Sequence, residues 1–219
     1  MHWRKLVEAS RLYRTLEARD RFYWSYREAE RTAWQSPKPE LENCKKLITF
    51  LNQWSTHTPL TPPQVQLVFE SLYSMLCELR TIHFVDLKDS HLGAIQDAFD
   101  KVAQSGERRY ESTGAAKILH IWAPNSLVMW DAAISAGYGI YRDATAPRPS
   151  GKDYAFTFLP RLQAEASEAI GTCMVEKGLD RKEAVQAIEE SACREPFTKL
   201  LDEYNYAKYT LSADSLWKS

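Results

Sequence analysis

The sequence lacks the short motifs that mark several common enzyme classes. It contains no GxxxxGK[ST] loop, no GxGxxG turn, no GxSxG elbow and no HExxH pair. Each of these motifs places backbone amides, a nucleophile or metal ligands at the spacing that its chemistry requires. Their absence disfavours ATP hydrolysis, dinucleotide binding, serine hydrolase chemistry and metal-dependent hydrolysis.

Cysteine and histidine are sparse, and neither is arranged as a set of metal ligands. The five histidines show no HxxxH spacing, and no two cysteines form a CxxC pair. The cysteines also form no compact disulfide framework, which is typical of reduced and mostly buried thiols. They are Cys44, Cys77, Cys173 and Cys193. We therefore expect neither a metal site nor a cofactor.

A strong charge of one sign and a long apolar run are missing as well. The formal net charge is −1, so the chain has no overall basic field with which to coat nucleic acid, although this does not exclude a local basic face. No run approaches the roughly 20 apolar residues that span a bilayer. The first residues, MHWRKLVEASRLYR, are amphipathic and contain no apolar signal segment. We expect a soluble, cytoplasmic protein without a membrane contact.

What the sequence does contain is helical periodicity along almost its whole length. Apolar residues recur every three to four positions, which predicts an all-α fold of roughly eight to ten helices. The expected helices cover residues 3–34 (one long helix or two), 40–54, 64–79, 90–104, 132–141, 154–177, 180–191 and 197–209. Residues 81–87, TIHFVDL, are the best strand candidate, with a turn or a helix extension as the alternative.

The domain organisation follows from the length and from the absence of repeats. We expect a single helical domain over residues 1–219, which can divide into two lobes, 1–104 and 105–219, with a cleft between them. In the first helix Arg4, Arg11, Arg14 and Arg21 fall within an arc of about 100°. This arc is either a solvated charged face or a stripe that faces phosphates.

The most informative stretch is residues 112–134, STGAAKILHIWAPNSLVMWDAAI. A small-residue turn, Ser112, Thr113, Gly114, Ala115 and Ala116, opens a short apolar helix that carries Lys117 and His120. Pro124 and Asn125 end this helix, and the chain returns through an apolar run to Asp131 at a second helix start. Because helix N-termini offer free backbone N–H groups, two neighbouring ones suit the binding of phosphate.

Asp131 and Lys117 each allow two interpretations. Asp131 is either an ordinary N-cap or a carboxylate at a cleft, where it would stabilise a cationic sugar or direct a water onto it. Lys117 is either a surface lysine, a phosphate clamp, or an amine nucleophile. Cleavage of a glycosidic bond passes through an oxocarbenium-like state, so a nearby carboxylate is what that chemistry requires.

Other residues are candidates for contact with a nucleic acid. His120 is either a core residue or a proton shuttle, and Trp130 either packs in the core or stacks on an extruded base. In the last helix Asn205 and Tyr206 either pack inward or recognise a base in the same cleft. The basic residues expected to contact the DNA backbone are Arg109, Arg148 and Lys152.

Residues 112–134 resemble the signature region of the helix-hairpin-helix DNA glycosylases. Thr113–Ala116 would match the glycine-bearing hairpin turn, Lys117 falls near a lysine found in some members, and Val128–Asp131 would match the apolar return and its essential aspartate. The chain departs from that pattern in having only Gly114 in the turn and a shorter interval from Lys117 to Asp131. The resemblance covers about 25 residues and implies a monofunctional enzyme rather than a lyase.

The resemblance implies a glycosylase that binds duplex DNA, extrudes one nucleotide and hydrolyses its N-glycosidic bond. Diverged relatives act on bulky or hypermodified pyrimidines, including those of phage DNA, so either base-excision repair or antiviral defence is the implied setting. The alternative is a non-catalytic helical module that binds nucleic acid or a partner protein, in which Asp131 is only a cap. A helical enzyme acting on a free nucleotide is a third hypothesis.

Overall fold

The computed structural model describes residues 1–18, 20–30, 34–54, 60–105, 111–141, 148–192 and 196–211. These residues form α-helices, short 3₁₀ and π-helical turns, and no strand. The expected all-α fold is therefore confirmed. Helix α8, a π-helical turn at Tyr154–Phe158 and helix α9 follow one another without a break, so the described residues contain ten separate α-helical segments.

The helix bounds agree with the periodicity of the sequence, except that α7 ends at Gly137, four residues before the expected end at 141. They are α1 (Trp3–Leu16), α2 (Asp20–Glu30), α3 (Leu41–Gln53), α4 (Pro62–Thr81), α5 (Asp89–Gln104), α6 (Ser112–Trp122), α7 (Ala132–Gly137), α8 (Gly151–Asp153), α9 (Leu159–Lys177), α10 (Arg181–Ser191) and α11 (Phe197–Asn205). A π-helical turn, Tyr206–Thr210, continues α11. The expected first unit, 3–34, is two helices rather than one.

The strand candidate at residues 81–87 is wrong, and the alternative of a turn is correct. Phe84–Asp86 form a single 3₁₀ turn after the end of α4. The amide of Phe84 donates to the carbonyl of Asn125 at 2.8 Å, whereas the next amides close the local turn. Phe84 is fully buried, so the apolar content of this segment anchors a connection instead of a sheet.

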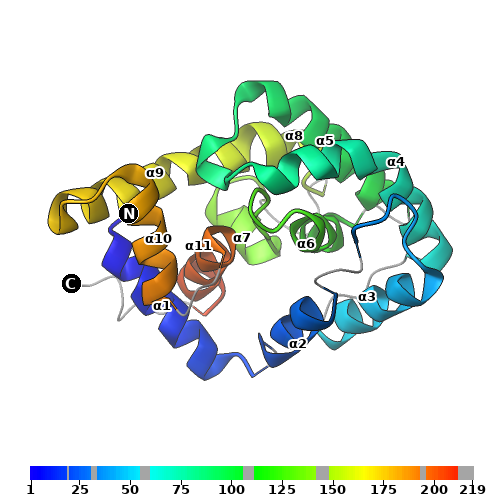
Figure 1. Ribbon diagram of the computed structural model, residues 1–219, viewed down its shortest axis with the longest axis horizontal. Coiled ribbons are helices and arrows are strands. Elements are labelled where there is room, and N and C mark those ends of the chain that lie inside the picture. Colours follow the sequence, from blue (N-terminus) through cyan, green and yellow to red (C-terminus); the bar gives the residue numbers. More distant parts are fainter. Residues whose placement is uncertain are drawn as a thin grey trace.

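Helix α6 lies at the centre of the molecule, with the other helices arranged around it (Figure 1). Its side chains are apolar on almost every side, and Ile118, Leu119 and Trp122 are fully buried. A helix without a polar face is stable in water only when neighbours cover it all round. Trp122 packs edge-on against Phe69 at 5.1 Å between ring centroids, and Trp34 lies 6.0 Å away.

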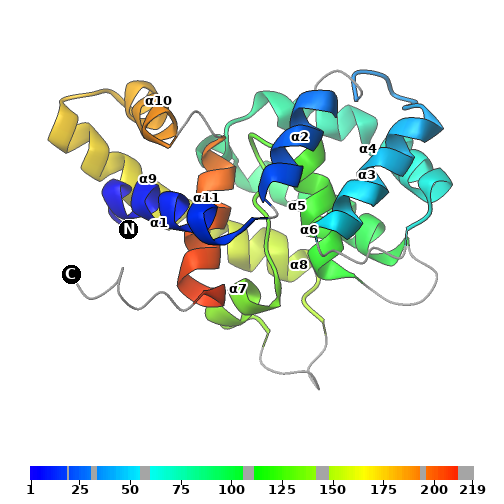
Figure 2. The same ribbon diagram turned by 90° about the horizontal axis from the view of Figure 1, so that it is seen from below.

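The first helix packs against the last ones. Helix α1 contacts α9, α10 and α11, while α2 to α6 contact one another in succession (Figure 2). Contacts therefore cross the boundary at residues 104 and 105 that the sequence suggests. Arg11 donates to the carbonyl of Ser191 and Arg14 to that of Ala192, both at the end of α10. Part of the arginine arc therefore connects α1 with α10.

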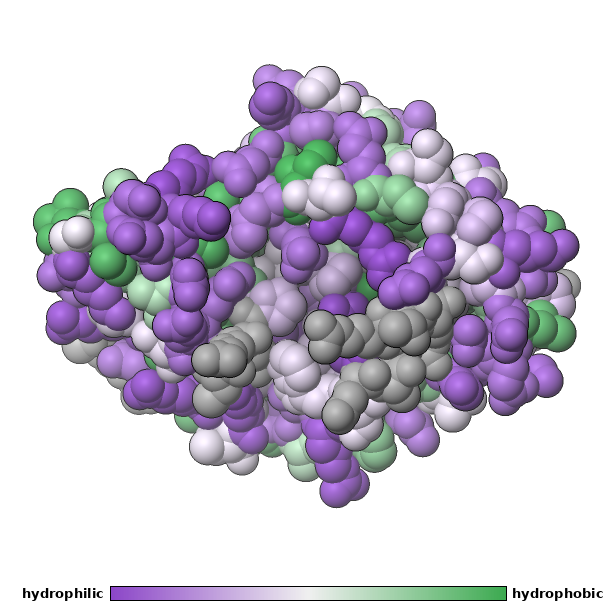
Figure 3. Space-filling view, viewed as in Figure 1, coloured by the Kyte–Doolittle hydropathy of each residue, from purple (hydrophilic) through white to green (hydrophobic). Residues whose placement is uncertain are grey.

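The described surface is polar with scattered apolar side chains. The face seen in Figure 3 is mostly hydrophilic, with small apolar groups between the charged ones. Among the described helices, none combines the length and apolar content that a membrane span needs. Cys44 and Cys173 are buried free thiols and Cys77 is an exposed one, whereas Cys193 lies outside the described residues.

Helix α8 approaches α5 so closely that only glycine fits at its first position. The Gly151 amide donates to Asp100 at 2.7 Å, and a Cβ added there would lie 2.5 Å from the backbone carbonyl oxygen of Gln96. We expect Gly151→Ala to lower the free energy of unfolding by about 1–3 kcal/mol, because a backbone atom cannot give way cheaply. Urea denaturation monitored by circular dichroism measures this change.

Gly93→Ala in α5 is the matched control, since a Cβ at Gly93 would meet no atom within 4 Å. Replacing a glycine inside an open helix by alanine raises stability by about 0.5–1 kcal/mol. Equal effects of the two substitutions would contradict the close approach of α8 to α5.

Candidate functional site

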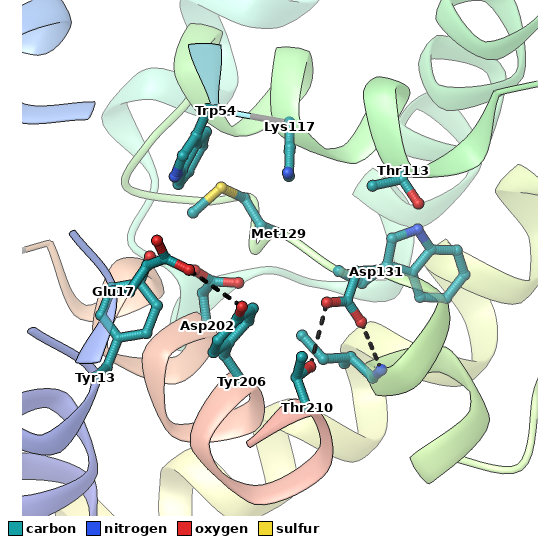
Figure 4. Close-up of a pocket in the computed structure, with 12 residues that line it drawn as sticks. Tyr13, Glu17, Trp54, Thr113, Lys117, Met129, Asp131, Asp202, Tyr206 and Thr210 are labelled. Carbon is teal, nitrogen blue, oxygen red and sulfur yellow. Dashed lines mark hydrogen bonds between the residues drawn. The ribbon is translucent and has the colours of Figure 1, made fainter. Parts of the chain in front are cut away.

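A pocket of about 220 Å³ lies where α1, α6, α7 and α11 meet (Figure 4). It is smaller than the roughly 300–1,000 Å³ of pockets that hold drug-sized ligands, so it suits a small group. Its lining combines carboxylates, one lysine and several aromatic rings. The lining residues are Tyr13, Glu17, Trp54, Thr113, Lys117, Met129, Trp130, Asp131, Ile134, Asp202, Tyr206 and Thr210.

The pocket brings together the two helix starts that the sequence singles out. Thr113 and Lys117 are four residues apart on one face of α6, and both point into the pocket in Figure 4. Asp131 approaches from the start of α7. The Lys117 ammonium lies 4.8 Å from the centre of the Trp54 ring, which places a cation against an aromatic wall.

Asp131 is both an N-cap and a pocket residue. Its Oδ1 accepts a hydrogen bond from the amide of Ile134 at 2.8 Å, which is the capping interaction, and its Oδ2 accepts one from the Thr210 hydroxyl at 3.3 Å. The two interpretations of Asp131 are therefore compatible. The two hydrogen bonds fix the direction of a half-buried carboxylate that lines the cavity.

Asp202 is a pocket residue that sequence reasoning did not select. It lies on α11 with its carboxylate largely buried, and burial raises its pKa to about 7, against the lowering effect of Lys199. Glu203 raises the pKa further. The available signal was an acidic residue that directly follows the apolar pair Leu200 and Leu201, four positions before Tyr206. A carboxyl that titrates near neutrality suits proton transfer.

Aromatic side chains form one wall of the pocket. Tyr13 meets Tyr206 edge to face at 5.3 Å between ring centroids, and the Tyr206 hydroxyl donates to Glu17 at 3.2 Å. Trp130 is almost fully buried, with its ring against Tyr154 and Phe158, and its indole N–H donates to the Ser112 carbonyl at 3.4 Å. Tyr206 and Trp130 therefore reach the pocket as expected, whereas Tyr13, Glu17 and Trp54 were not anticipated.

His120 lies in the core and does not line the pocket. Its Nδ1 lies 2.7 Å from the Leu127 carbonyl, which can only accept, so Nδ1 carries the proton and Nε2 accepts from the Tyr23 hydroxyl at 2.8 Å. Burial lowers its pKa to about 3, which keeps it neutral. Asn205 is also buried outside the lining, where its Oδ1 accepts from Tyr138.

The small-residue segment is the first turn of α6 rather than a hairpin turn. Gly114, Ala115 and Ala116 are buried, which lets α6 pack closely on α5. The amide of Ala115 already donates to the Glu111 carbonyl at 3.0 Å, so it is not available to a phosphate. Ser112 is buried as well.

Two of the three expected basic contacts, Arg148 and Lys152, do not line the pocket. Arg148 is exposed and pairs with Glu111 at 3.5 Å, and Lys152 is exposed on α8. Arg109 lies outside the described residues. Within the described segments, no group of three or more His, Cys, Asp or Glu side chains is arranged to hold a metal ion.

Comparisons of this chain with protein-family models, with curated proteins and with solved structures find no significant match. The function is therefore argued from the geometry of the pocket.

The buried His120 makes stability depend on pH in a defined direction. Its folded-state pKa of about 3 lies below the ordinary value of about 6.5, so below pH 6.5 the unfolded chain binds one more proton. As the pH falls from about 6 to about 4, we expect this residue to lower the free energy of unfolding by about 1.4 kcal/mol per pH unit. Chemical denaturation across this range, with wild type and His120→Gln compared, measures the contribution.

Between these pH values the free energy of unfolding of His120→Gln should change less steeply with pH than that of wild type, by about 1.4 kcal/mol per pH unit. This difference does not depend on the stability of the variant at neutral pH. His91→Gln, at the partly exposed start of α5, controls for the loss of an imidazole elsewhere. Identical slopes for wild type and His120→Gln would show that His120 is not buried as a neutral ring.

Proposed function

We propose that the protein is a DNA glycosylase-like enzyme that hydrolyses the N-glycosidic bond of a modified base. The observation that carries the proposal is the position of Asp131, whose capping bond to Ile134 and bond to Thr210 hold its carboxylate at a small pocket. Lys117 and an aromatic wall share this pocket. These are the residue types that a reaction at a nucleotide sugar requires.

The chemistry that Asp131 would perform is electrostatic. As the bond between the sugar and the base breaks, positive charge develops on the sugar ring. A carboxylate already fixed by two hydrogen bonds stabilises that charge without reorganising during the reaction. The same carboxylate orients the water that attacks the sugar, which gives base release without a covalent enzyme intermediate.

The aromatic wall and Lys117 fit an extruded nucleotide. Tyr13, Trp54 and Tyr206 offer faces and edges on which a base can stack, and stacking tolerates different bases. Among the described lining residues Lys117 supplies the one positive charge, which would attract the adjacent phosphate. The partner we propose is duplex DNA with one base turned out. A bulky or hypermodified pyrimidine of foreign DNA is the substrate class tested first, with only its base ring inside the pocket of about 220 Å³ and its added groups outside.

Asp131→Asn separates the charge of Asp131 from its capping role, because asparagine caps a helix as well as aspartate does. We expect base release to fall about 100-fold or more while the melting temperature changes little. The measurement is alkali-induced cleavage of DNAs that carry uracil, oxidised, alkylated or hypermodified pyrimidine bases.

Asp180→Asn is the matched control, since Asp180 caps α10 by accepting from Glu183 at 2.8 Å outside the pocket. Its base release should equal that of wild type. Full activity of Asp131→Asn on an accepted substrate would refute the proposed role of Asp131.

The capping bond of Asp131 also favours a second candidate, a helical module that binds nucleic acid without cutting it. On this hypothesis DNA affinity falls steeply with salt and no base is released from any DNA. Asp131→Ala then costs only the cap, about 1 kcal/mol of stability. The base-release assay with all the DNAs distinguishes the two candidates.

Lys117 is expected to act as a phosphate contact and not as a nucleophile. Lys117→Gln should weaken DNA binding and reduce the slope of log affinity against log salt by about one. Lys101→Gln, on the exposed face of α5, should leave both unchanged. Borohydride should trap no covalent complex with wild type, whereas trapping that requires Lys117 would identify a Schiff base and a lyase.

A further inference from the structure

A fully buried lysine lies next to the pocket. Lys199 on α11 has no exposed side-chain surface, and its ammonium lies 3.0 Å from Glu203, 3.2 Å from Asp20 and 3.6 Å from Asp202. Although burial lowers the pKa of Lys199, the charge of Glu203 and its other neighbours raises it well above its ordinary value. Lys199 is therefore a fixed internal cation.

The charges of this cluster do not balance. One ammonium faces three carboxylates, so full ionisation would leave two uncompensated negative charges, with Lys199 and Glu203 completely buried. Burying unpaired charge is costly, and the usual response is that one carboxyl keeps a proton. Asp202 is the one of these three carboxyls that lines the pocket.

We infer that Asp202 is the proton donor and acceptor of the pocket, and that Lys199, held by Asp20 and Glu203, is the positioning residue that orients it. This inference rests on the proposed function for the identity of the substrate. It goes beyond that function because it assigns a second catalytic carboxyl, opposite Lys117 and Asp131, and a device that controls its protonation. Figure 4 shows Asp202 and Asp131 on the same cavity, beside Tyr206.

Groups from several helices set the protonation of Asp202. After burial, Lys199 lowers its pKa, Glu203 raises it, Lys117 from α6 lowers it and Asp131 from the start of α7 raises it. Two tyrosines also interact electrostatically with Asp202, Tyr13 from α1 and Tyr154 from the π-helical turn before α9. Two further carboxylates lie nearby: Asp20 of α2, which pairs with Lys199, and Glu17 after α1, which lines the pocket.

The proposed step conserves atoms and charge. The bond between the sugar C1′ and the base nitrogen breaks, its electron pair goes to the base, and the proton of the Asp202 carboxyl is transferred to the base. Water then forms a bond to C1′, and the proton that the water loses restores the Asp202 carboxyl. Asp131 stabilises the sugar cation between these events. The products are the free base and an abasic sugar.

The first test needs no substrate. Carboxyl NMR of protein labelled with ¹³C-aspartate should show one resonance that titrates near pH 7 and is absent in Asp202→Asn. Glu203→Gln removes a negative neighbour and should move this midpoint down by about one unit, whereas Lys199→Met should move it up by a similar amount. Glu203→Gln is nearly isosteric, so it keeps the test decisive if Lys199→Met does not fold.

The second test is the pH profile of base release. The rate for wild type should fall as pH rises through about 7, and this limb should be absent in Asp202→Asn and displaced downward in Glu203→Gln. Asp97→Asn, an exposed aspartate of α5, is the matched control and should follow wild type.

The two tests separate the inference from the proposed function. No aspartate titrating between about pH 6 and 8, or an unchanged pH limb in Asp202→Asn, overturns the role of Asp202 even if bases are released. If the titration shifts as expected but no base is released from any DNA, the glycosylase proposal is refuted. Asp202 is then supported as a group that transfers protons in another reaction of the same pocket.

Discussion

The structure depends on the burial of α6. Apart from Thr113 and Lys117 this helix is almost entirely apolar and buried, so the hydrophobic effect places it at the centre, and α5 and the other helices around it in Figure 1 cover it. Its first turns are the place where the apolar covering ends, because Thr113 and Lys117 are only partly buried there. The pocket lies at this point. Its position therefore follows from the packing of the core.

The polar residues of the pocket are held by bonds that serve the fold. Asp131 begins α7, Tyr206 reaches Glu17 of α1, and the indole of Trp130 ties the return segment to Ser112. These bonds require no additional free energy for the site, because each of them also stabilises the fold. Lys199 is different. A buried ammonium among three carboxylates often stabilises a protein less than well-packed apolar residues in the same place would.

Local patterns predicted the helices but only part of the site. Period and capping chemistry are encoded within a few residues, which is why Asp180 and Asp131 were identified as helix starts and the all-α fold is confirmed. Tyr13 and Trp54 reach the pocket only through tertiary packing, which no local pattern reveals. Of the two interpretations of His120, the structure supports the core residue, and no local pattern could decide between them because the Tyr23 hydroxyl that satisfies the ring is 97 positions away.

The pocket joins segments that are far apart in the sequence. Tyr13 lies in α1 and Glu17 directly follows it, whereas Tyr206 and Thr210 belong to the turn after α11. Contacts of such long sequence separation form late, because the loop between them must close first. During synthesis the protein therefore has no complete pocket until the turn Tyr206–Thr210 has left the ribosome and docked. A partly made chain cannot bind a ligand that needs the complete pocket.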